Sequence, residues 1–276
     1  VYNAYCTYAC ICAENAPTVM SVMVGHIGQP YVAMDAAPGL KIIVRAGAGY
    51  DNVDLAAATA HNVCVMNTPG QNSNAVAELA IAMMVFMSRN QFTPGTGMEI
   101  KGKRLGIQAY GNVGRLVAEK AKALGMEVMA FDPFVPAENI EADGVMVAET
   151  LEQLYEQCNF VSLHIPALPS TIGSIGYNLI DRMPRGGCLV NTARREVINE
   201  PELEKVLADR PDIKYVTDVA AKCQAELDEK FPKQVFATPK KMGAETAEAN
   251  SNAGLAAARQ ICEYFATGCT KFQLNK

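Results

Sequence analysis

The sequence has no excess of basic residues and no apolar run long enough to span a membrane. Its 24 Lys and Arg against 29 Asp and Glu give a net charge of −5, which argues against a nucleic-acid-binding surface. A membrane span needs roughly 18 or more apolar residues in a row, whereas the longest run, residues 79–87, has nine. The first residues also lack the basic start of a signal peptide. We therefore expect a cytoplasmic protein with no membrane or nucleic-acid partner.

The nine cysteines are scattered along the chain. They include no CxxC pair, and such pairs are the usual signature of a structural zinc site. An odd number at irregular spacing is also unlike a disulfide framework. We therefore expect buried free thiols in a reducing compartment and no metal site.

Short apolar runs alternate with helical patterns along the chain. Runs of four or five residues bounded by turn residues are typical of buried parallel strands. Stretches with helical spacing, as in 113–124 and 201–208, fall among them and indicate right-handed βαβ units. The fold class expected is α/β, with a doubly wound parallel sheet of the Rossmann type and a smaller flavodoxin-like unit. The runs lie at 41–44, 63–66, 104–107, 127–131, 160–164, 187–190 and 214–217.

One glycine-rich turn matches the dinucleotide-binding pattern G-x-G-x-x-G, with Ala109 in place of its first glycine. Gly111 lets the backbone approach a pyrophosphate, and Gly114 lets the following helix pack closely on the strand. The phosphates would meet the amides at the N-terminus of that helix. Asp132 ends the next strand, 18 residues after Gly114, where it would bind ribose hydroxyls and repel a 2′-phosphate. The motif therefore predicts NAD, rather than NADP, as the cofactor.

Several further segments resemble those of the D-2-hydroxyacid dehydrogenase family. The likeness extends over about residues 22–264 and is greatest to short D-3-phosphoglycerate dehydrogenases that lack the C-terminal regulatory domain. It implies oxidation of D-3-phosphoglycerate to 3-phosphohydroxypyruvate, the step that opens serine biosynthesis, by hydride transfer from C2 to NAD. The segments are RAGAGYDNVDL at 45–55, NTPGQNS at 67–73, AELA at 77–80, NTAR at 191–194 and GAETAEA at 243–249.

The resemblance also implies how the chain is divided. Two long helical stretches, at about 74–88 and 244–264, are expected to join two domains. Residues 74–249 would form the NAD-binding domain including the linking helix. Residues 1–73 and 250–276 would form the substrate-binding domain, so that the substrate lies between the two. Family members pair through their NAD-binding domains, so a homodimer is expected.

Roles of single residues follow from the resemblance. Arg194 would grip the substrate carboxylate with its planar guanidinium and polarise the C2 oxygen. Asp218 would bind the nicotinamide carboxamide, and His164 would line the adenine side rather than act as the base. The residues expected to bind the cofactor are Tyr110, Gly111, Asn112, Val113, Asp132, Pro133, His164, Ile165, Pro166, Thr171, Thr192, Ala193, Asp218, Gly243 and Ala244. Those expected to bind the substrate are Arg45, Ala46, Gly47, Ala48, Gly49 and Asn74.

The catalytic base departs from the family pattern. Counting back from Gly243 places Lys241 where the family has its catalytic histidine, and Lys240 is the alternative. A lysine titrates ordinarily near about 10.4, so it works better as a base beside cations such as Arg194 than beside a carboxylate. We expect Lys241 to exchange the C2 hydroxyl proton. The competing interpretations are a substrate clamp and an inert lysine.

The family's glutamate partner of the base is also replaced. Cys223 occupies its position, five residues after Asp218, and the nearest acid along the chain is Glu226. Glu226 is therefore the candidate replacement, provided that a loop shift brings it into the site.

The identity of the substrate rests on the resemblance, because no phosphate site is evident. Arg45 would either face a substrate phosphate or brace its own turn, and His26 would either contact the phosphate or be structural. Residues 90–102 lack the family's basic loop. Other D-2-hydroxy acids of the glyoxylate or hydroxypyruvate type therefore remain alternatives. So does a binding protein that senses NAD without turnover.

Overall fold

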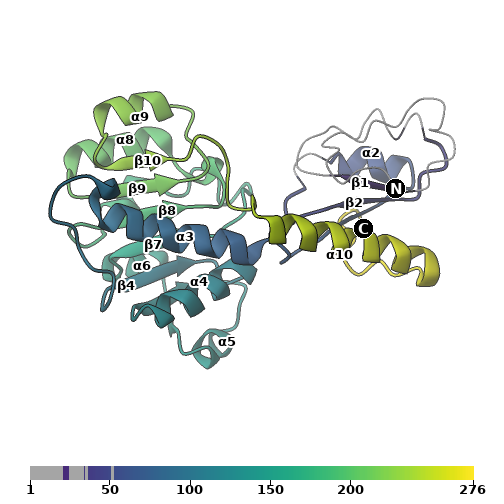
Figure 1. The fold of residues 1–276 in the computed structure, drawn as a ribbon, viewed down its shortest axis with the longest axis horizontal. Coiled ribbons are helices and arrows are strands. Elements are labelled where there is room, and N and C mark those ends of the chain that lie inside the picture. The colour runs from purple at the N-terminus through teal and green to yellow at the C-terminus, as the bar shows by residue number, and fades with distance from the viewer. Residues whose placement is uncertain (1–20, 25–33, 35–36, 51–52) are drawn as a thin grey trace. The chain divides into compact units, whose positions relative to one another are not determined.

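The computed structural model describes residues 21–24, 34, 37–50 and 53–276 of the chain. These belong to two compact units (Figure 1). The larger is Ser73–Glu245, and the smaller combines Val1–Asn72 with Thr246–Lys276.

A parallel sheet of seven strands, in the order β10-β9-β8-β7-β4-β5-β6, forms the centre of the larger unit. The inner strands β7 and β8 are fully buried, as expected when helices cover both faces of a parallel sheet. The chain leaves β4 in one direction for β5 and β6, then returns to its other side for β7 to β10, which is the doubly wound arrangement predicted. The strands are β4 (Arg104–Gln108), β5 (Glu127–Phe131), β6 (Met146–Val147), β7 (Phe160–Leu163), β8 (Cys188–Asn191), β9 (Lys214–Thr217) and β10 (Val235–Ala237).

Helices cover the two faces of this sheet. On one face, α3 (Ser73–Ser88), α4 (Asn112–Ala123) and α5 (Ala137–Ala142) bury an apolar layer that includes Met84, Val117 and Ile140. Figure 1 shows α3 and α4 in front of the strands. The opposite layer is formed by α6 (Leu151–Gln157), α7 (Tyr177–Ile180), α8 (Glu200–Asp209) and α9 (Gln224–Lys230). Two short 3-10 turns, η2 (Asn90–Phe92) and η3 (Arg195–Val197), complete the unit.

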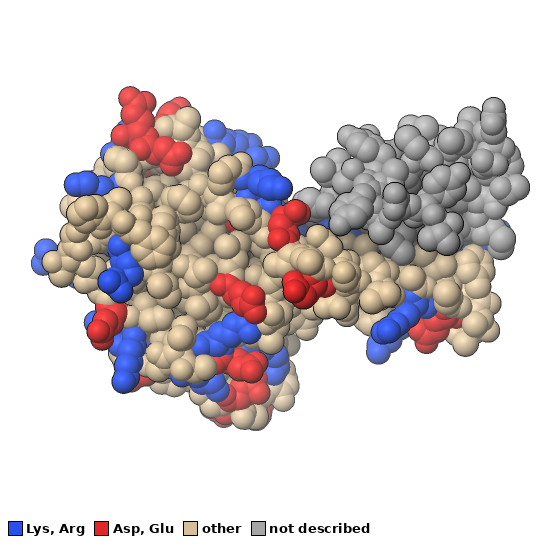
Figure 2. Space-filling model, viewed as in Figure 1, with Lys and Arg blue, Asp and Glu red and all other residues tan. Residues whose placement is uncertain are grey.

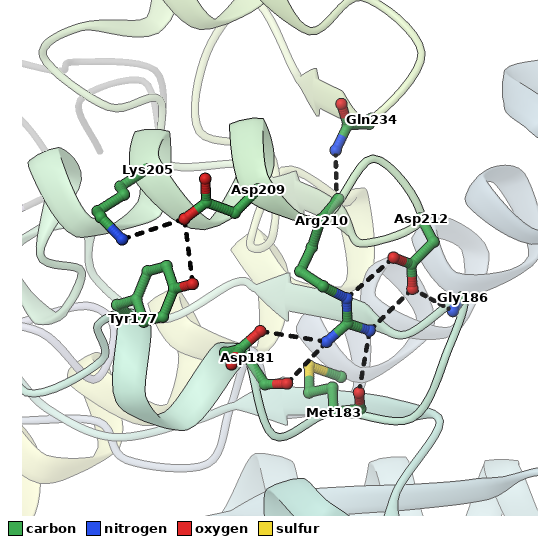
Figure 3. A network of polar contacts seen from close by, with 9 residues as sticks. All are labelled: Tyr177, Asp181, Met183, Gly186, Lys205, Asp209, Arg210, Asp212 and Gln234. Atoms are coloured by element: carbon green, nitrogen blue, oxygen red, sulfur yellow. Dashed lines mark hydrogen bonds and ion pairs between the residues drawn. The ribbon is translucent and has the colours of Figure 1, made fainter.

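A network around Arg210 ties together the segments that precede β8 and β9 (Figure 3). Its guanidinium donates to both carboxylate oxygens of Asp212, at 2.9 and 2.8 Å, and to the carbonyl oxygens of Asp181 and Met183. Asp212 also accepts from the Gly186 amide at 2.8 Å. The guanidinium holds the pKa of the Asp212 carboxyl well below its usual range. These contacts lie at the amino ends of the strands, so we attribute them to folding rather than to chemistry.

In the described part of the smaller unit, three parallel strands pair in the order β1-β2-β3, with helices α2 (Leu55–Ala60) and α10 (Ala247–Thr267). The strands are β1 (Ser21–Val24), β2 (Ile42–Arg45) and β3 (Cys64–Asn67). The C-terminal segment covers the edge of β3, where the Leu274 amide donates to the Val65 carbonyl at 2.8 Å. α10 ends at Gly268, whose φ of 72° places it in the left-handed region that terminates many helices.

On the face of the larger unit shown in Figure 2, basic and acidic side chains are interspersed. Among the described residues, no helix has the length and apolar character needed to cross a membrane. Six described cysteines are free thiols. Cys262 is exposed, which corrects the expectation that the thiols are buried.

Candidate active site

The turn between β4 and α4 is held by backbone contacts to the neighbouring strand β5. The Ala109 amide donates to the Phe131 carbonyl at 2.9 Å, and the Tyr110 amide donates to Asp132 Oδ2 at 2.8 Å. Asp132 Oδ1 accepts from the Phe134 amide, also at 2.8 Å. Ala109 has a φ of 78°, so this chain keeps a side chain in the left-handed conformation that favours glycine.

The two remaining motif glycines meet different surroundings. A Cβ on Gly114 would collide with the Ala109 carbonyl oxygen and lie 3.0 Å from the Ile107 side chain, so this position permits no side chain. A Cβ on Gly111 would meet no atom of the described residues within 4 Å. Gly111 is the N-cap of the 12-residue helix α4, and no side chain in the described part of the chain caps the amides there. The open space beside these amides fits a pyrophosphate, with Asn112 and Val113 in the first turn.

Two buried tyrosines, Tyr110 and Tyr155, support the turn between β4 and α4. The sequence did not indicate the residues to which they are hydrogen-bonded. Tyr110 donates to Asp143 at 3.1 Å, and burial together with this bond raises the pKa of its hydroxyl to about 12. Arg115 also binds Asp143, at 2.8 Å, and its guanidinium lies 5.0 Å from the Tyr110 ring centre. Tyr155 donates to the side chain of Gln108 at 3.0 Å inside the core. The side chain of Tyr110 is therefore an anchor, which leaves only its backbone for a ligand.

His164 follows β7 and lies against Ser162, with 3.0 Å between its Nε2 and the serine Oγ. Burial lowers the pKa of its imidazole to about 4, so the ring is neutral near pH 7 and a weak base. Of the next two predicted residues, Ile165 is buried and Pro166 is exposed. The Thr171 hydroxyl is engaged within the same loop, where it donates to the Pro166 carbonyl at 2.5 Å and accepts from the Leu168 amide at 2.8 Å.

Arg194 stands in the turn after β8. Asn191, which is fully buried, accepts from the Ala193 amide at 3.0 Å and donates to the Arg194 carbonyl at 3.0 Å. The guanidinium of Arg194 donates to the Ala193 carbonyl at 2.9 Å. The Thr192 hydroxyl oxygen is buried and has no hydrogen-bond partner within the described chain.

Asp218, after β9, is 1% exposed and holds the turn that carries the predicted base. Its Oδ2 accepts from the Gly243 amide at 2.7 Å and from the Met242 amide at 3.1 Å. A Cβ on Gly243 would lie 3.0 Å from that oxygen and 3.2 Å from Val76, so glycine fits there best. Asp218 Oδ1 is buried and without a hydrogen-bond partner in the described residues. A carboxamide N–H would satisfy it.

The two candidate lysines differ in their surroundings. Lys240 is 73% exposed at its side chain, and its Nζ lies 3.9 Å from Glu245. Lys241 is partly buried and directly precedes Met242, whose amide Asp218 binds. Lys241 is therefore the less exposed of the two lysines and the one that adjoins the turn bound by Asp218.

The acid in contact with position 223 is Glu200, which sequence reasoning missed. Its carboxylate accepts from the amides of Lys222, at 2.9 Å, and of Cys223, at 3.3 Å. Burial, and then the nearby Glu200, raises the pKa of the Cys223 thiol to about 11, so this position is uncharged near pH 7. Glu226 is 65% exposed at its side chain, in the first turn of α9, and lies 3.9 Å from Lys230. Glu200 is thus the acid that contacts position 223, and the role expected for Glu226 stays a prediction.

In the smaller unit, the turn after β2 is braced by its own residues. Arg45 is 7% exposed, donates to the Ala46 carbonyl at 3.0 Å and covers Gly47, where a Cβ would overlap the guanidinium. The Gly47 amide donates to the buried Thr68 hydroxyl at 2.6 Å. Of the two roles expected for Arg45, the structure shows the bracing contact.

The remaining predicted substrate residues lie in three places. The Ala48 carbonyl accepts from Asn67 at 2.7 Å, beside the half-buried Gly49. Asn74 lies in the first turn of α3 and donates to Glu78 at 2.7 Å. His26 lies outside the described residues.

Within the larger unit, the predicted residues gather at one edge of the sheet. All seven strands run parallel, so the turns after β4, β5, β7, β8 and β9 lie at their common carboxyl edge, where doubly wound sheets bind ligands. The open turn at Gly111, the Asp132 carboxylate, and the oxygens of Thr192 and Asp218 that lack a partner in the described residues fit the pyrophosphate, ribose and nicotinamide parts of NAD.

Comparisons with known proteins show which family the chain is similar to. Residues 70–240 match the family described as D-isomer specific 2-hydroxyacid dehydrogenase, NAD binding domain. The chain is similar to an NAD+-bound 3-phosphoglycerate dehydrogenase of Entamoeba histolytica, with 45% identity and a TM-score of 0.87 over 96% of this chain and 85% of that one. It is 34% identical to a D-3-phosphoglycerate dehydrogenase of Methanocaldococcus jannaschii, over 83% of this chain and 46% of the relative.

A hydroxypyruvate reductase of Thermotoga maritima is also 34% identical, over 83% of this chain and 78% of that protein. The chain spans about half the length, 46%, of the Methanocaldococcus jannaschii relative that it matches. The family match covers most of the larger unit and contains every strand of its sheet. The chain therefore belongs to the D-isomer specific 2-hydroxyacid dehydrogenase family and carries that family's NAD-binding domain.

Proposed function

We propose that the protein oxidises D-3-phosphoglycerate to 3-phosphohydroxypyruvate with NAD. The observation that carries this proposal is Asp218, which binds the turn of the lysine through one oxygen and keeps the other buried, with no hydrogen-bond partner among the described residues. One carboxylate would thus fix both the cofactor's reactive ring and the amine beside it. The similarity to two D-3-phosphoglycerate dehydrogenases supports the choice of substrate.

The residues of the larger unit would hold NAD along the carboxyl edge of its sheet. The amides at Gly111 would bind the pyrophosphate, and Asp132 would bind the ribose hydroxyls. Asp218 Oδ1 would accept from the carboxamide and orient the nicotinamide ring. When bound, NAD supplies the acceptor for the C2 hydride on oxidation and the donor on reduction.

Arg194 would bind the substrate and polarise its C2 oxygen. Its guanidinium offers paired donors that match a carboxylate, and Asn191 fixes the backbone on both sides of it. Backbone amides from Ala46 to Gly49 remain predicted to bind the substrate.

Lys241 would take the C2 hydroxyl proton during oxidation and return it during reduction. This role requires the neutral amine, which a nearby carboxylate would disfavour. An uncharged Cys223 at the position of the family's glutamate supports the role, because its side chain adds no negative charge, and the Glu200 carboxylate beside it accepts hydrogen bonds from two backbone amides. Oxidation should consequently accelerate toward alkaline pH.

Reduction of hydroxypyruvate or glyoxylate is the second candidate activity. The hydroxypyruvate reductase of Thermotoga maritima is as similar in sequence as the archaeal phosphoglycerate dehydrogenase, and this chain covers more of it. The contact of the buried Arg45 with its own turn also supports this candidate, because it favours the bracing role over the phosphate-binding role.

Absorbance of NADH at 340 nm tests the proposal. We expect kcat/KM with NAD to be higher for D-3-phosphoglycerate than for D-glycerate or D-lactate, and NADP to be a poor substitute. No preference for the phosphorylated acid would reject the substrate. Binding of NADH without turnover of any 2-hydroxy acid would indicate a sensing protein instead.

We further propose a homodimer formed through the NAD-binding units, and a cytoplasmic location. Free thiols in the described part of the chain support a reducing compartment. Sedimentation at micromolar concentration should give twice the 29.6 kDa mass of the chain, whereas a monomer would contradict the dimer.

A further inference from the structure

Two buried side chains join the turns that carry Arg194 and Asp218. Asn191 ends β8 and Thr217 ends β9; both are 0% exposed, and they are paired in register. The Thr217 hydroxyl donates to the Asn191 carbonyl at 2.8 Å and accepts from the Val219 amide at 2.9 Å. One of these hydrogen bonds reaches the turn after β8 and the other reaches the turn after β9. The Thr217 hydroxyl therefore joins the two turns.

The side chain of Asn191 continues this link toward Arg194. Its Oδ1 accepts from the Ala193 amide, and its Nδ2 donates to the Arg194 carbonyl, both at 3.0 Å. The same Nδ2 lies 3.4 Å from the hydroxyl of the buried Tyr215. An amide is the side chain that supplies both a donor and an acceptor here, whereas a carboxylate has acceptors only.

We propose that Asn191, linked to Thr217, is a positioning residue that sets the place of Arg194 relative to Asp218. The inference rests on the proposed function, in which Arg194 binds the substrate and Asp218 orients the nicotinamide. Hydride transfer requires the two reacting carbons to be held in contact distance, and small displacements reduce the rate strongly. The hydrogen bond between Thr217 and Asn191 would fix that distance without contacting the substrate or NAD.

Asn191→Asp tests the proposal because it keeps the shape and the acceptor but removes the donor to the Arg194 carbonyl. A buried carboxyl titrates above its usual range, and its protonated form regains one O–H donor. The charged and titratable groups around it are the Tyr215 hydroxyl, Arg194, and the Glu200 and Asp218 carboxylates that act on Tyr215. His164, after the neighbouring strand β7, is neutral near pH 7.

We expect Asn191→Asp to lower kcat/KM at least about tenfold at pH 8, as for the loss of a buried hydrogen bond. The loss should shrink at pH 6, while the dissociation constant of NADH changes less than twofold. Asn159→Asp is the matched control, because Asn159 Oδ1 accepts from the Arg104 amide at the amino ends of the strands. Its kinetics should equal those of the wild type at both pH values.

Thr217→Val provides a second variant, should Asn191→Asp fail to fold. It should also reduce kcat/KM with NADH binding retained. Hydrogen exchange of the peptide covering 192–198, measured with NADH bound, should increase in both variants and stay unchanged in Asn159→Asp. An equal loss of activity at pH 6 and 8, or unchanged exchange, would overturn the proposal. An inactive wild type whose variants still show the exchange difference would reject the proposed function but retain the positioning role.

Discussion

The carbonyl oxygen of Ala109 occupies the space that a Cβ atom on Gly114 would need. At Gly111, in contrast, a Cβ would meet no atom within 4 Å in the part of the chain that the structure describes. Gly111 and Gly114 therefore have different structural roles within the same motif. Gly114 permits the helix to approach the strand, and Gly111 leaves room for a ligand.

Substitution of each glycine by alanine should separate these roles. Gly114→Ala should lower the free energy of unfolding by about 1 to 3 kcal/mol, the usual cost of overpacking. Gly111→Ala should change it by less than about 0.5 kcal/mol yet weaken NADH binding at least tenfold. Urea denaturation and a fluorescence titration with NADH measure both quantities. Wild-type NADH affinity in Gly111→Ala would show that the phosphates do not bind at this turn.

Ala109→Gly should stabilise the protein. A left-handed conformation costs an alanine about 1 to 2 kcal/mol, of which the greater freedom of glycine in the unfolded chain cancels a part. The net gain expected at this φ of 78° is about 0.5 to 1 kcal/mol in urea denaturation. A loss of stability would mean that the turn does not strain Ala109.

Acid should destabilise the protein partly through His164. Its folded pKa of about 4 lies below the ordinary value, so the unfolded chain binds this proton more tightly. Stability is therefore lost as the pH falls from about 6.5 toward 4. Between pH 7 and 5 the wild type should lose about 2 kcal/mol more than His164→Gln in urea denaturation. Equal losses would show that the imidazole titrates normally in the folded protein.

The sheet of the larger unit was largely predictable because its inner strands are buried on both faces and so form continuous apolar runs. The run 127–131 coincides with β5, and 214–217 with β9. The edge strands β6 and β10 have two and three residues. They were missed because strands this short, at the edges of the sheet, leave no such run.

Local sequence motifs were enough to identify the turns of the candidate site. Contacts between residues far apart in the sequence could not be predicted in this way. The replacement of the motif's first glycine by Ala109 was evident from the sequence, and the structure gives this residue a φ of 78°. The pairing of Glu200 with the amides of Lys222 and Cys223 joins segments 22 and 23 residues apart, and no local pattern marks it. Distance along the chain therefore selected Glu226, whereas the packing of α8 against the loop after β9 selected Glu200.

The proton-transfer role of Lys241 is the centre of this account, and kcat measures it most directly. Lys241→Ala should lower kcat for oxidation of D-3-phosphoglycerate at least about a hundredfold, with NADH binding unchanged. Lys240→Ala, at a side chain that is 73% exposed, and Lys233→Ala, at an exposed lysine before β10, should keep kcat within twofold of the wild type. A Lys241→Ala enzyme with the wild-type kcat and only a raised KM would contradict the account.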